Sequence, residues 1–263
     1  MSRIARFVVP ELPHHVTQRG NRRERVFFGD DDYRLYRDLL REACDKAAVS
    51  VWAYVLMPNH VHLILTPSTP DGLARALGKA HRRYSAFVNA RLRVTGHLFQ
   101  SRFGSAVMDE EHLMAAARYI ALNPVRAKLV ARPQDWPWSS ARAHLEGRDD
   151  GLARVGPLLE RLNGRFADLL ESNEAPERVT ALRAAEGIGR PLGSEDFLIR
   201  LAALTGLRIT VTVHSIQRPR LCSGLPCCIF HLTCLVIPKI PCYVSKDNCT
   251  VTVTPNAARS PAR

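Results

Sequence analysis

The sequence lacks two features that would place the chain in a membrane or in an oxidising compartment. It has no apolar run that approaches the roughly 18 residues a membrane-spanning helix needs, and no apolar signal-peptide core near its first residues. Cysteine is scarce over most of the chain, because Cys44 is the only one among the first 221 residues. A body with one cysteine fits a reducing compartment. We therefore expect a cytoplasmic protein and no membrane among its partners.

Acidic residues are also in short supply. The 263 residues include 25 Asp and Glu against 37 Lys and Arg, which gives a formal net charge of +12. A surface of this sign attracts polyanions, so nucleic acid is the favoured partner; an anionic membrane surface is the weaker reading, and a merely basic soluble protein is the plain alternative. The length allows one large or two small domains with a substantial core.

The order of strand-like and helix-like segments predicts the architecture. Met57-Pro58-Asn59 supplies turn residues, so the strands on either side should form a tight hairpin. Asp109 resembles a helix cap, and Pro124 is expected to end the helix that follows it. The order strand, helix, strand, strand, helix, strand, helix predicts an α+β fold with a ferredoxin-like split βαβ arrangement and an antiparallel sheet. The expected strands are 14–20, 49–56, 60–66 and 96–108, and the expected helices are 30–48, 70–94 and 109–123.

Sequence character divides the chain into three expected parts. Residues 1–145 hold the α+β unit, residues 146–208 form a charged helical C-terminal extension, and residues 209–263 are an atypical Cys-rich tail. The tail contains six cysteines, one acidic residue and no steady hydrophobic period. We expect it to be disordered or translated out of frame. A metal knuckle is the less favoured alternative because no spacing matches a zinc pattern well; its ligands would be Cys222, Cys227, Cys228, His231 and Cys234.

Two histidines stand two residues apart in the apolar run LMPNHVHLIL. On a strand, His60 and His62 would point to the same face, about 6.5–7 Å apart along the strand. Val61, Leu63 and Leu65 would then pack on the opposite face. Neutral imidazole binds divalent metals, so the two histidines are candidate metal ligands. The pair alone leaves ordinary core or surface histidines as the alternative.

A second candidate group lies in the segment RYIALNPVRAKLV. Tyr119 and Asn123 are four residues apart, so on a helix they share one face with Cβ atoms about 5–6 Å apart. His112 continues the same stripe and could assist deprotonation of a tyrosine. Taken separately, each residue has a plain structural alternative: a core tyrosine, a helix stop before Pro124, and an exposed or satisfied histidine.

Five segments, in order, resemble the REP-associated tyrosine transposases, which are single-tyrosine relatives of the HUH endonucleases. The segments are PHHVTQRGNRR, MPNHVHLIL, GHLFQSRF, YIALNPVRAKLV and WPWSSARAH, within residues 6–145. The segment RPLGSEDFLIRLAALTG, residues 190–206, is similar to the C-terminal segment of that family. The resemblance implies an HUH endonuclease core for residues 1–145 and DNA transposition as the activity.

The resemblance also implies roles for single residues. His60 and His62 match the HUH histidines, and Tyr119 matches the nucleophilic tyrosine. Asn123 occupies the position where relatives carry a polar third metal ligand, often the longer Gln. A Mg²⁺ or Mn²⁺ ion would polarise the scissile phosphate, and attack by Tyr119 would leave a 5′-phosphotyrosine and a free 3′-hydroxyl.

Strand transfer of this kind needs single-stranded or hairpin DNA as the partner. Tyr84 or Phe99 could offer faces on which bases stack, with burial in the core as the alternative. The candidate DNA-contacting residues are Arg19, Arg22, Arg23, Arg25, Arg82 and Arg83. The alternative for these arginines is an ordinary charged surface that contacts only solvent.

Three functions remain open on this basis. The favoured prediction is a metal-dependent transposase that nicks and rejoins single-stranded DNA. The first alternative is a protein that binds DNA hairpins without cleaving them. The second is a phosphodiesterase that uses water, with a structural Tyr119. Monomer and homodimer are equally compatible with the sequence.

Overall fold

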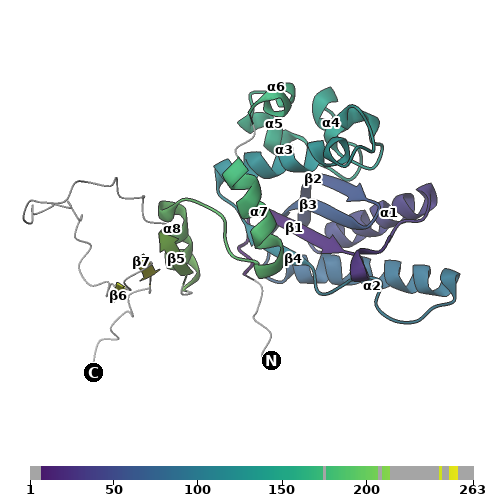
Figure 1. The fold of residues 1–263 in the computed structure, drawn as a ribbon, viewed down its shortest axis with the longest axis horizontal. Coiled ribbons are helices and arrows are strands. Elements are labelled where there is room, and N and C mark those ends of the chain that lie inside the picture. Colours follow the sequence, from purple (N-terminus) through teal and green to yellow (C-terminus); the bar gives the residue numbers. More distant parts are fainter. Residues whose placement is uncertain (1–6, 174–175, 207–208, 214–242, 245–248, 254–263) are drawn as a thin grey trace, which may run out of the picture. The chain divides into compact units, whose positions relative to one another are not determined.

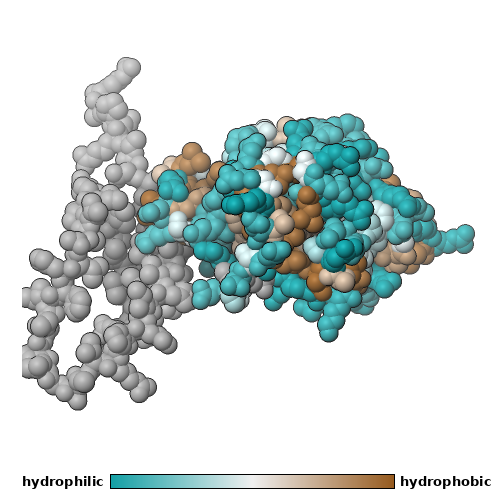
Figure 2. All heavy atoms as spheres, turned by 90° about the horizontal axis from the view of Figure 1, so that it is seen from above, coloured by the Kyte–Doolittle hydropathy of each residue, from teal (hydrophilic) through white to brown (hydrophobic). Residues whose placement is uncertain are grey.

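The computed structural model describes residues 7–173, 176–206, 209–213, 243–244 and 249–253. The chain forms two compact units, Met1–Gly193 and Ser194–Arg263. The domain boundaries expected after residues 145 and 208 were inferred from changes in the character of the sequence, and they stay predictions. The face of the molecule in Figure 2 is mainly hydrophilic among the described residues, with hydrophobic side chains in limited areas between hydrophilic ones.

The first unit is built on a four-stranded sheet (Figure 1). The strands are β1 (His14–Arg19), β2 (Val49–Met57), β3 (His60–Pro67) and β4 (Gly104–Val107). They lie in the order β2-β3-β1-β4, and each neighbouring pair is antiparallel. With helices between β1 and β2 and between β3 and β4, this is the ferredoxin-like split βαβ order. The predicted α+β fold class is confirmed.

Helices cover both faces of this sheet (Figure 1). α1 (Asp30–Lys46) and α2 (Gly72–Leu92) share one hydrophobic core with Val61, Leu63 and Leu65 of β3. α3 (Glu110–Arg126) and α7 (Pro176–Ile188) share a second core with Ile64. Since successive strand residues point to opposite faces, the even-numbered residues of β3 face α3 and α7.

Short helices complete the first unit. They are η1 (Asn21–Arg23), η2 (Pro133–Asp135), α4 (Ala141–Glu146), α5 (Gly156–Arg161) and α6 (Phe166–Glu171). Trp138 is buried and stacks on Tyr33, with ring centroids 4.8 Å apart. The indole N–H of Trp136 donates to the carbonyl of Leu56 at 3.0 Å. Both tryptophans therefore close the core beside β2.

The end predicted for the third helix was wrong. Asp109 does cap α3, because its carboxylate accepts from the backbone N–H of His112 at 2.9 Å. However, the helix continues through Pro124 to Arg126. Proline removes one backbone donor, and so close to the end of a helix this interrupts a single bond. The last turn is closed beyond it, where Ala127 donates to the carbonyl of Asn123 at 3.0 Å.

The described residues of the second unit form a well-capped helix and a small sheet. α8 (Glu195–Thr205) begins at Ser194, whose hydroxyl accepts from the backbone N–H of Phe197 at 3.3 Å. β5 (Ile209–Val213), β6 (Tyr243–Val244) and β7 (Cys249–Val253) pair in the order β5-β7-β6. The five residues named for a tail knuckle, Cys222 to Cys234, lie outside the described residues. Within the described ranges, no helix has the length and apolar character to cross a membrane.

A buried ion pair joins α1 to α2 and supports a stability prediction. Asp32 is 1% exposed, and its carboxylate accepts from both terminal nitrogens of Arg91 and from the backbone N–H of Phe28. Although burial by itself raises the pKa of Asp32, the bonds from Arg91 and Phe28 hold that pKa below its ordinary value. Removing the carboxylate would leave the guanidinium and this N–H without their acceptor.

We expect Asp32→Ala to lower the free energy of unfolding by about 1–3 kcal/mol, measured by urea denaturation. Asp31→Ala is the matched control, because the Asp31 carboxylate is 95% exposed and pairs with Arg34 on the surface. That substitution should change the free energy of unfolding by less than about 0.5 kcal/mol. Equal effects of the two substitutions would contradict the structural role of Asp32.

Candidate active site and nucleic-acid interface

The two histidines that the sequence singled out, His60 and His62, lie side by side at the start of β3. Their ring centroids are 5.0 Å apart, with the ring planes at 87°. His62 is 1% exposed and His60 is half-buried. The strand alternation predicted from the sequence holds here, since Val61 packs in the core on the opposite face.

A third histidine that sequence reasoning missed joins this pair. His15 lies on β1, and its Nε2 is 3.1 Å from Nδ1 of His62, so one ring donates its N–H to the other. The two rings are stacked, with centroids 5.2 Å apart and planes at 6°. Pairing of β1 with β3 sets His15 opposite Ile64 and Thr17 opposite His62, which makes the histidine contact a diagonal one across the two strands.

Tyr119 approaches the histidines from α3. Its ring centroid lies 5.3 Å from that of His62 and 6.4 Å from that of His15, edge-on in both cases. Tyr119 is 7% exposed. The helix brings this side chain onto the sheet because its neighbours Ala116 and Ile120 are buried in the core beneath α3. The structure thus brings together three of the four residues that the sequence singled out, His60, His62 and Tyr119.

The three imidazoles are neutral at ordinary pH. Burial lowers the pKa of His15 to about 4. Burial, and secondly the charge of Arg19, lowers the pKa of His60 to about 4. Burial and then the neighbouring histidines lower the pKa of His62 well below its usual range. Neutral imidazole keeps a free nitrogen lone pair, which is the form that binds metals.

A hydrogen bond sets the tautomer of His60. Its Nδ1 is 2.6 Å from Oδ1 of Asn59, which can only accept, so Nδ1 carries the proton. Nε2 of His60 then holds the lone pair. Partners of this kind orient the rings of metal-binding histidines in general. The donor chemistry at His60 and His62 therefore suits a divalent cation.

Asn123 is the fourth residue singled out. It is 8% exposed and lies one helical turn after Tyr119 on α3. Its amide oxygen could complete a set with two imidazole nitrogens. Among the described residues, no group of three or more His, Cys, Asp and Glu side chains has an arrangement that could hold a metal ion. A cation at this site would therefore depend on the amide of Asn123 and on water.

His112 is engaged at the start of α3. Its Nδ1 lies 2.7 Å from the carboxylate of Asp109, the same group that caps the helix. The sequence separation places His112 about two turns before Tyr119. This contact favours the structural alternative for His112, a satisfied histidine at a helix end.

The basic loop, residues 20–26, is tied to the turn that leads into His60. Gly20 donates to the carbonyl of Asn59 at 2.8 Å, and the side chain of Asn59 donates to the carbonyl of Arg23 at 3.0 Å. A Cβ atom at Gly20 would lie 2.3 Å from the carbonyl oxygen of Glu24, so only glycine permits this turn.

Arg19, at the end of β1, pairs with His60 in the strand register. Arg22, Arg23 and Arg25 are exposed. The backbone of this loop is thus tied to the turn that precedes His60.

The basic positions of α2 are used differently. Arg82 and Arg83 are exposed, and Arg83 forms an ion pair with Glu42 of α1. Lys79 shares that carboxylate at 3.5 Å. Part of the positive charge of α2 is therefore offset by α1.

For the two aromatic residues considered for base stacking, the structure favours the alternative of burial in the core. Tyr84 is fully buried, and its hydroxyl donates to the carbonyl of Val26; Phe99 is 9% exposed. Among the described residues, Phe28 and Phe87 are exposed instead, at 48% and 44%. The guanidinium of Arg91 lies 5.6 Å and 5.4 Å from these two rings. Aromatic residues in amphipathic segments lie in the core more often than on the surface. Nothing in the sequence indicated that Tyr84 and Phe99 would be buried while Phe28 and Phe87 are exposed.

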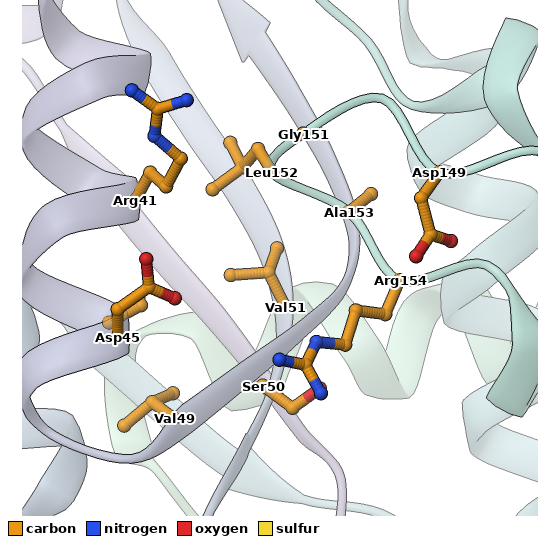
Figure 3. A pocket seen from close by; sticks show the side chains of 11 residues that line it. Arg41, Asp45, Val49, Ser50, Val51, Asp149, Gly151, Leu152, Ala153 and Arg154 are labelled. Carbon is orange, nitrogen blue, oxygen red and sulfur yellow. The ribbon is translucent and has the colours of Figure 1, made fainter.

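The pocket in Figure 3 lies elsewhere in the first unit. Its volume is about 150 Å³, and residues of α1, of β2 and of the segment 149–154 line it. Arg41 and Arg154 face it together with Asp45 and Asp149, so its charges are mixed. It contains none of the residues that the sequence singled out.

The part of the chain that matches known proteins is the part that carries these site residues. Residues 8–123 match the family described as "Transposase IS200 like". A candidate REP-associated tyrosine transposase of Haemophilus influenzae is 27% identical over 118 residues, which covers 40% of this chain and 66% of that relative, just under two thirds.

Two solved structures are similar to the chain. One is a REP-associated tyrosine transposase bound to a REP hairpin, with 20% identity, a TM-score of 0.48, and coverage of 59% of this chain and 90% of the other. The second is a candidate transposase from Deinococcus radiodurans, with 24% identity, a TM-score of 0.32, and coverage of 49% and 92%. The resemblance seen in the sequence is confirmed: residues 8–123 of this chain are similar to transposases of the IS200-like family.

Proposed function

We propose that the chain is a transposase that nicks and rejoins single-stranded or hairpin DNA through a 5′-phosphotyrosine at Tyr119. The observation that carries this proposal is the contact of the Tyr119 ring with His62, itself in contact with His15 and His60. A tyrosine side chain in contact with neutral imidazoles combines a nucleophile with groups that can hold a cation. The transposase family of residues 8–123 is consistent with DNA as the substrate.

In the first step, the hydroxyl oxygen of Tyr119 forms a bond to phosphorus, and the bond from phosphorus to the 3′ oxygen breaks. The phenolic proton is lost, and the departing 3′ oxygen gains a proton as a free 3′-hydroxyl. The phosphodiester energy is kept in the phosphotyrosine ester. A different 3′-hydroxyl then reverses the step and joins two strands. Because the ester keeps this energy, a tyrosine nucleophile permits strand transfer, whereas attack by water would lose the energy.

His60 and His62, with Asn123, are the residues that would hold a Mg²⁺ or Mn²⁺ ion. When bound, the ion would neutralise charge on the scissile phosphate. His15 would keep the ring of His62 in place through the bond between the two rings. Asn59 would do the same for His60.

The test is incubation of the full chain with a panel of labelled single-stranded hairpin DNAs, with Mg²⁺, Mn²⁺ or EDTA. The readout is a covalent protein–DNA product on a denaturing gel. The proposal predicts a product that depends on the metal. DNA binding across the panel without a covalent product would contradict it.

The second candidate function is binding of DNA hairpins without cleavage. Two observations favour it: Tyr119 is only 7% exposed, and Asn123 is shorter than the Gln common in relatives. The covalent product separates the two candidates, because a protein that only binds would retain affinity for the hairpin and form no ester.

The basic loop is the proposed contact with the DNA backbone. We expect Arg22→Gln with Arg23→Gln to weaken binding of single-stranded DNA. The slope of log K against log salt concentration should become smaller by about 1.4, because each phosphate contact on a single strand contributes about 0.7. Fluorescence anisotropy at several salt concentrations measures this slope.

The matched control for the loop is Arg34→Gln with Arg41→Gln. Both are exposed arginines of α1 whose guanidiniums form ion pairs with Asp31 and Asp38. This pair of substitutions removes the same net charge away from His60. If it lowers the slope as much as the loop pair does, the loop has no special contact with DNA and only net charge matters.

A further inference from the structure

Two arginine side chains flank the ring of the proposed nucleophile. The guanidinium carbon of Arg126 lies 4.3 Å from the ring centroid of Tyr119, and that of Arg183 lies 5.7 Å from it. Nη2 of Arg126 also donates to the backbone carbonyl of Tyr119 at 2.6 Å. This bond ties the side chain of Arg126 to the helical turn that carries Tyr119. Both arginines lie beyond the segment that matches the transposase family, residues 8–123.

The packing of α7 determines the position of Arg183. Val179, Leu182 and Ala185 of α7 are buried in the core that also contains Tyr119. Their spacing of three residues defines one apolar face of the helix. Arg183 directly follows Leu182 and is exposed, so it lies at the edge of that face. An ion pair between Arg178 and Glu111 links α7 to the first turn of α3.

Positive charge gathers around the proposed nucleophile. The guanidinium carbons of Arg126 and Arg183 lie 4.3 Å and 5.7 Å from the ring centroid of Tyr119. Arg19 is paired with His60 in the register of β1 on β3. An anion would be attracted to such a place.

Guanidinium is suited to a phosphate in particular. It presents N–H donors in a planar fork that matches two phosphate oxygens, and it retains its charge at all ordinary pH values. A phosphate attacked by the Tyr119 oxygen must lie next to the Tyr119 ring. The two guanidiniums are already held around that ring.

We propose that Arg183 of α7, together with Arg126 of α3, binds the phosphate group that Tyr119 attacks. This inference rests on the proposed function, and it gives the helical extension a direct part in the active site. Arg126 would hold the phosphate from the helix that carries the nucleophile. Arg183 would hold it from a helix outside the matched family segment.

The first test measures DNA binding and does not depend on cleavage. The full chain with Tyr119→Phe is compared with the same protein carrying also Arg183→Gln, using a single-stranded hairpin oligonucleotide. We expect the second substitution to weaken binding about 3–10-fold and to lower the salt slope by about 0.7, the value for one phosphate contact on a single strand. An unchanged slope overturns the inference, and so does a complete absence of DNA binding.

Arg178→Gln is the matched control, because Arg178 lies on the same helix and its guanidinium pairs with Glu111. It removes an equal charge from α7 away from the ring of Tyr119. We expect it to leave the salt slope unchanged. Thermal unfolding of both variants verifies that α7 remains folded. Equal slopes for the two variants would mean that Arg183 contributes only net charge.

The second test follows the covalent product with an intact Tyr119. We expect Arg183→Gln to slow its formation about 100–1,000-fold, in line with the loss of one charge-stabilising donor, and Arg183→Lys to restore part of the rate. A faster reaction with Arg183→Gln would mean that α7 covers the site and does not assist, which overturns the inference. If the unsubstituted chain forms no product, the proposed function fails, whereas the salt slope still decides whether Arg183 contacts a phosphate.

Discussion

Tyr119→Phe is expected to abolish the covalent protein–DNA product, with a loss of at least about 10⁴-fold in its rate of formation. The substitution removes one oxygen atom and keeps the ring. The contacts of that ring with His62 and with Arg126 are therefore expected to persist. DNA binding should remain within about twofold, because the hydroxyl contributes little to a surface contact made mainly by arginines. A denaturing gel with labelled hairpin DNA measures the product, and anisotropy measures binding.

Tyr33→Phe is the matched control for this experiment. Tyr33 has the same exposed fraction as Tyr119, 7%, and stacks on Trp138 in the other core of the first unit. It should leave the product unchanged. Cleavage that survives Tyr119→Phe would identify water as the nucleophile and the protein as a metal-dependent phosphodiesterase. Loss of product in both variants would instead report damaged folding.

The strand period explains why part of the site could be predicted. His60 and His62 are two residues apart, and a period of two on a strand fixes their common face whatever surrounds them. The capping role of Asp109 is equally local, because it needs only the backbone N–H of a residue three positions later. The element order was likewise readable, since each helix or strand has its own hydrophobic period.

The missed residues depend on contacts distant in sequence. His14 and His15 are adjacent and identical in type, so only the register of β1 on β3 decides which of them meets His62. With β1 correctly paired to β3, the alternation of His15, Thr17 and Arg19 would have indicated that His15 lies on the same face as His62. Arg183 is separated from Tyr119 by 64 positions, and nothing in the sequence of α7 marks one arginine of that helix over another.

Pro124 illustrates a local rule that tertiary structure overrides. The residue before a proline is biased away from helical geometry, which predicted an end at Asn123. Asn123 and Pro124 are both buried against the rest of the first unit. Burial of this turn favours continuation of the helix by more than the local bias opposes it. The turn that follows Tyr119 is therefore helical, and Arg126 returns to the ring of Tyr119.

His62→Gln is expected to reduce the affinity for Mn²⁺ by at least about 100-fold and to remove the metal-dependent product. His62 is 1% exposed and contacts His15, His60 and Tyr119, so no other side chain can take its position. Loss of one of two imidazole ligands removes a direct metal bond. His15→Gln should weaken Mn²⁺ binding less, by about 10–100-fold, because outer partners of metal ligands have effects of that size. Electron paramagnetic resonance of free Mn²⁺ measures the affinity without DNA.

His14→Gln separates the metal site from the strand that carries it. His14 is adjacent to His15 and buried, but its ring bonds to the carbonyl of Leu12 and to the N–H of Val9 instead of to His62. Because adjacent strand residues point to opposite faces, this substitution alters β1 without reaching the site. It should cost stability and leave Mn²⁺ affinity unchanged. If His14→Gln lowers that affinity as much as His15→Gln does, disturbance of β1 explains both results, and the bond from His15 to His62 has no special part in holding the ion.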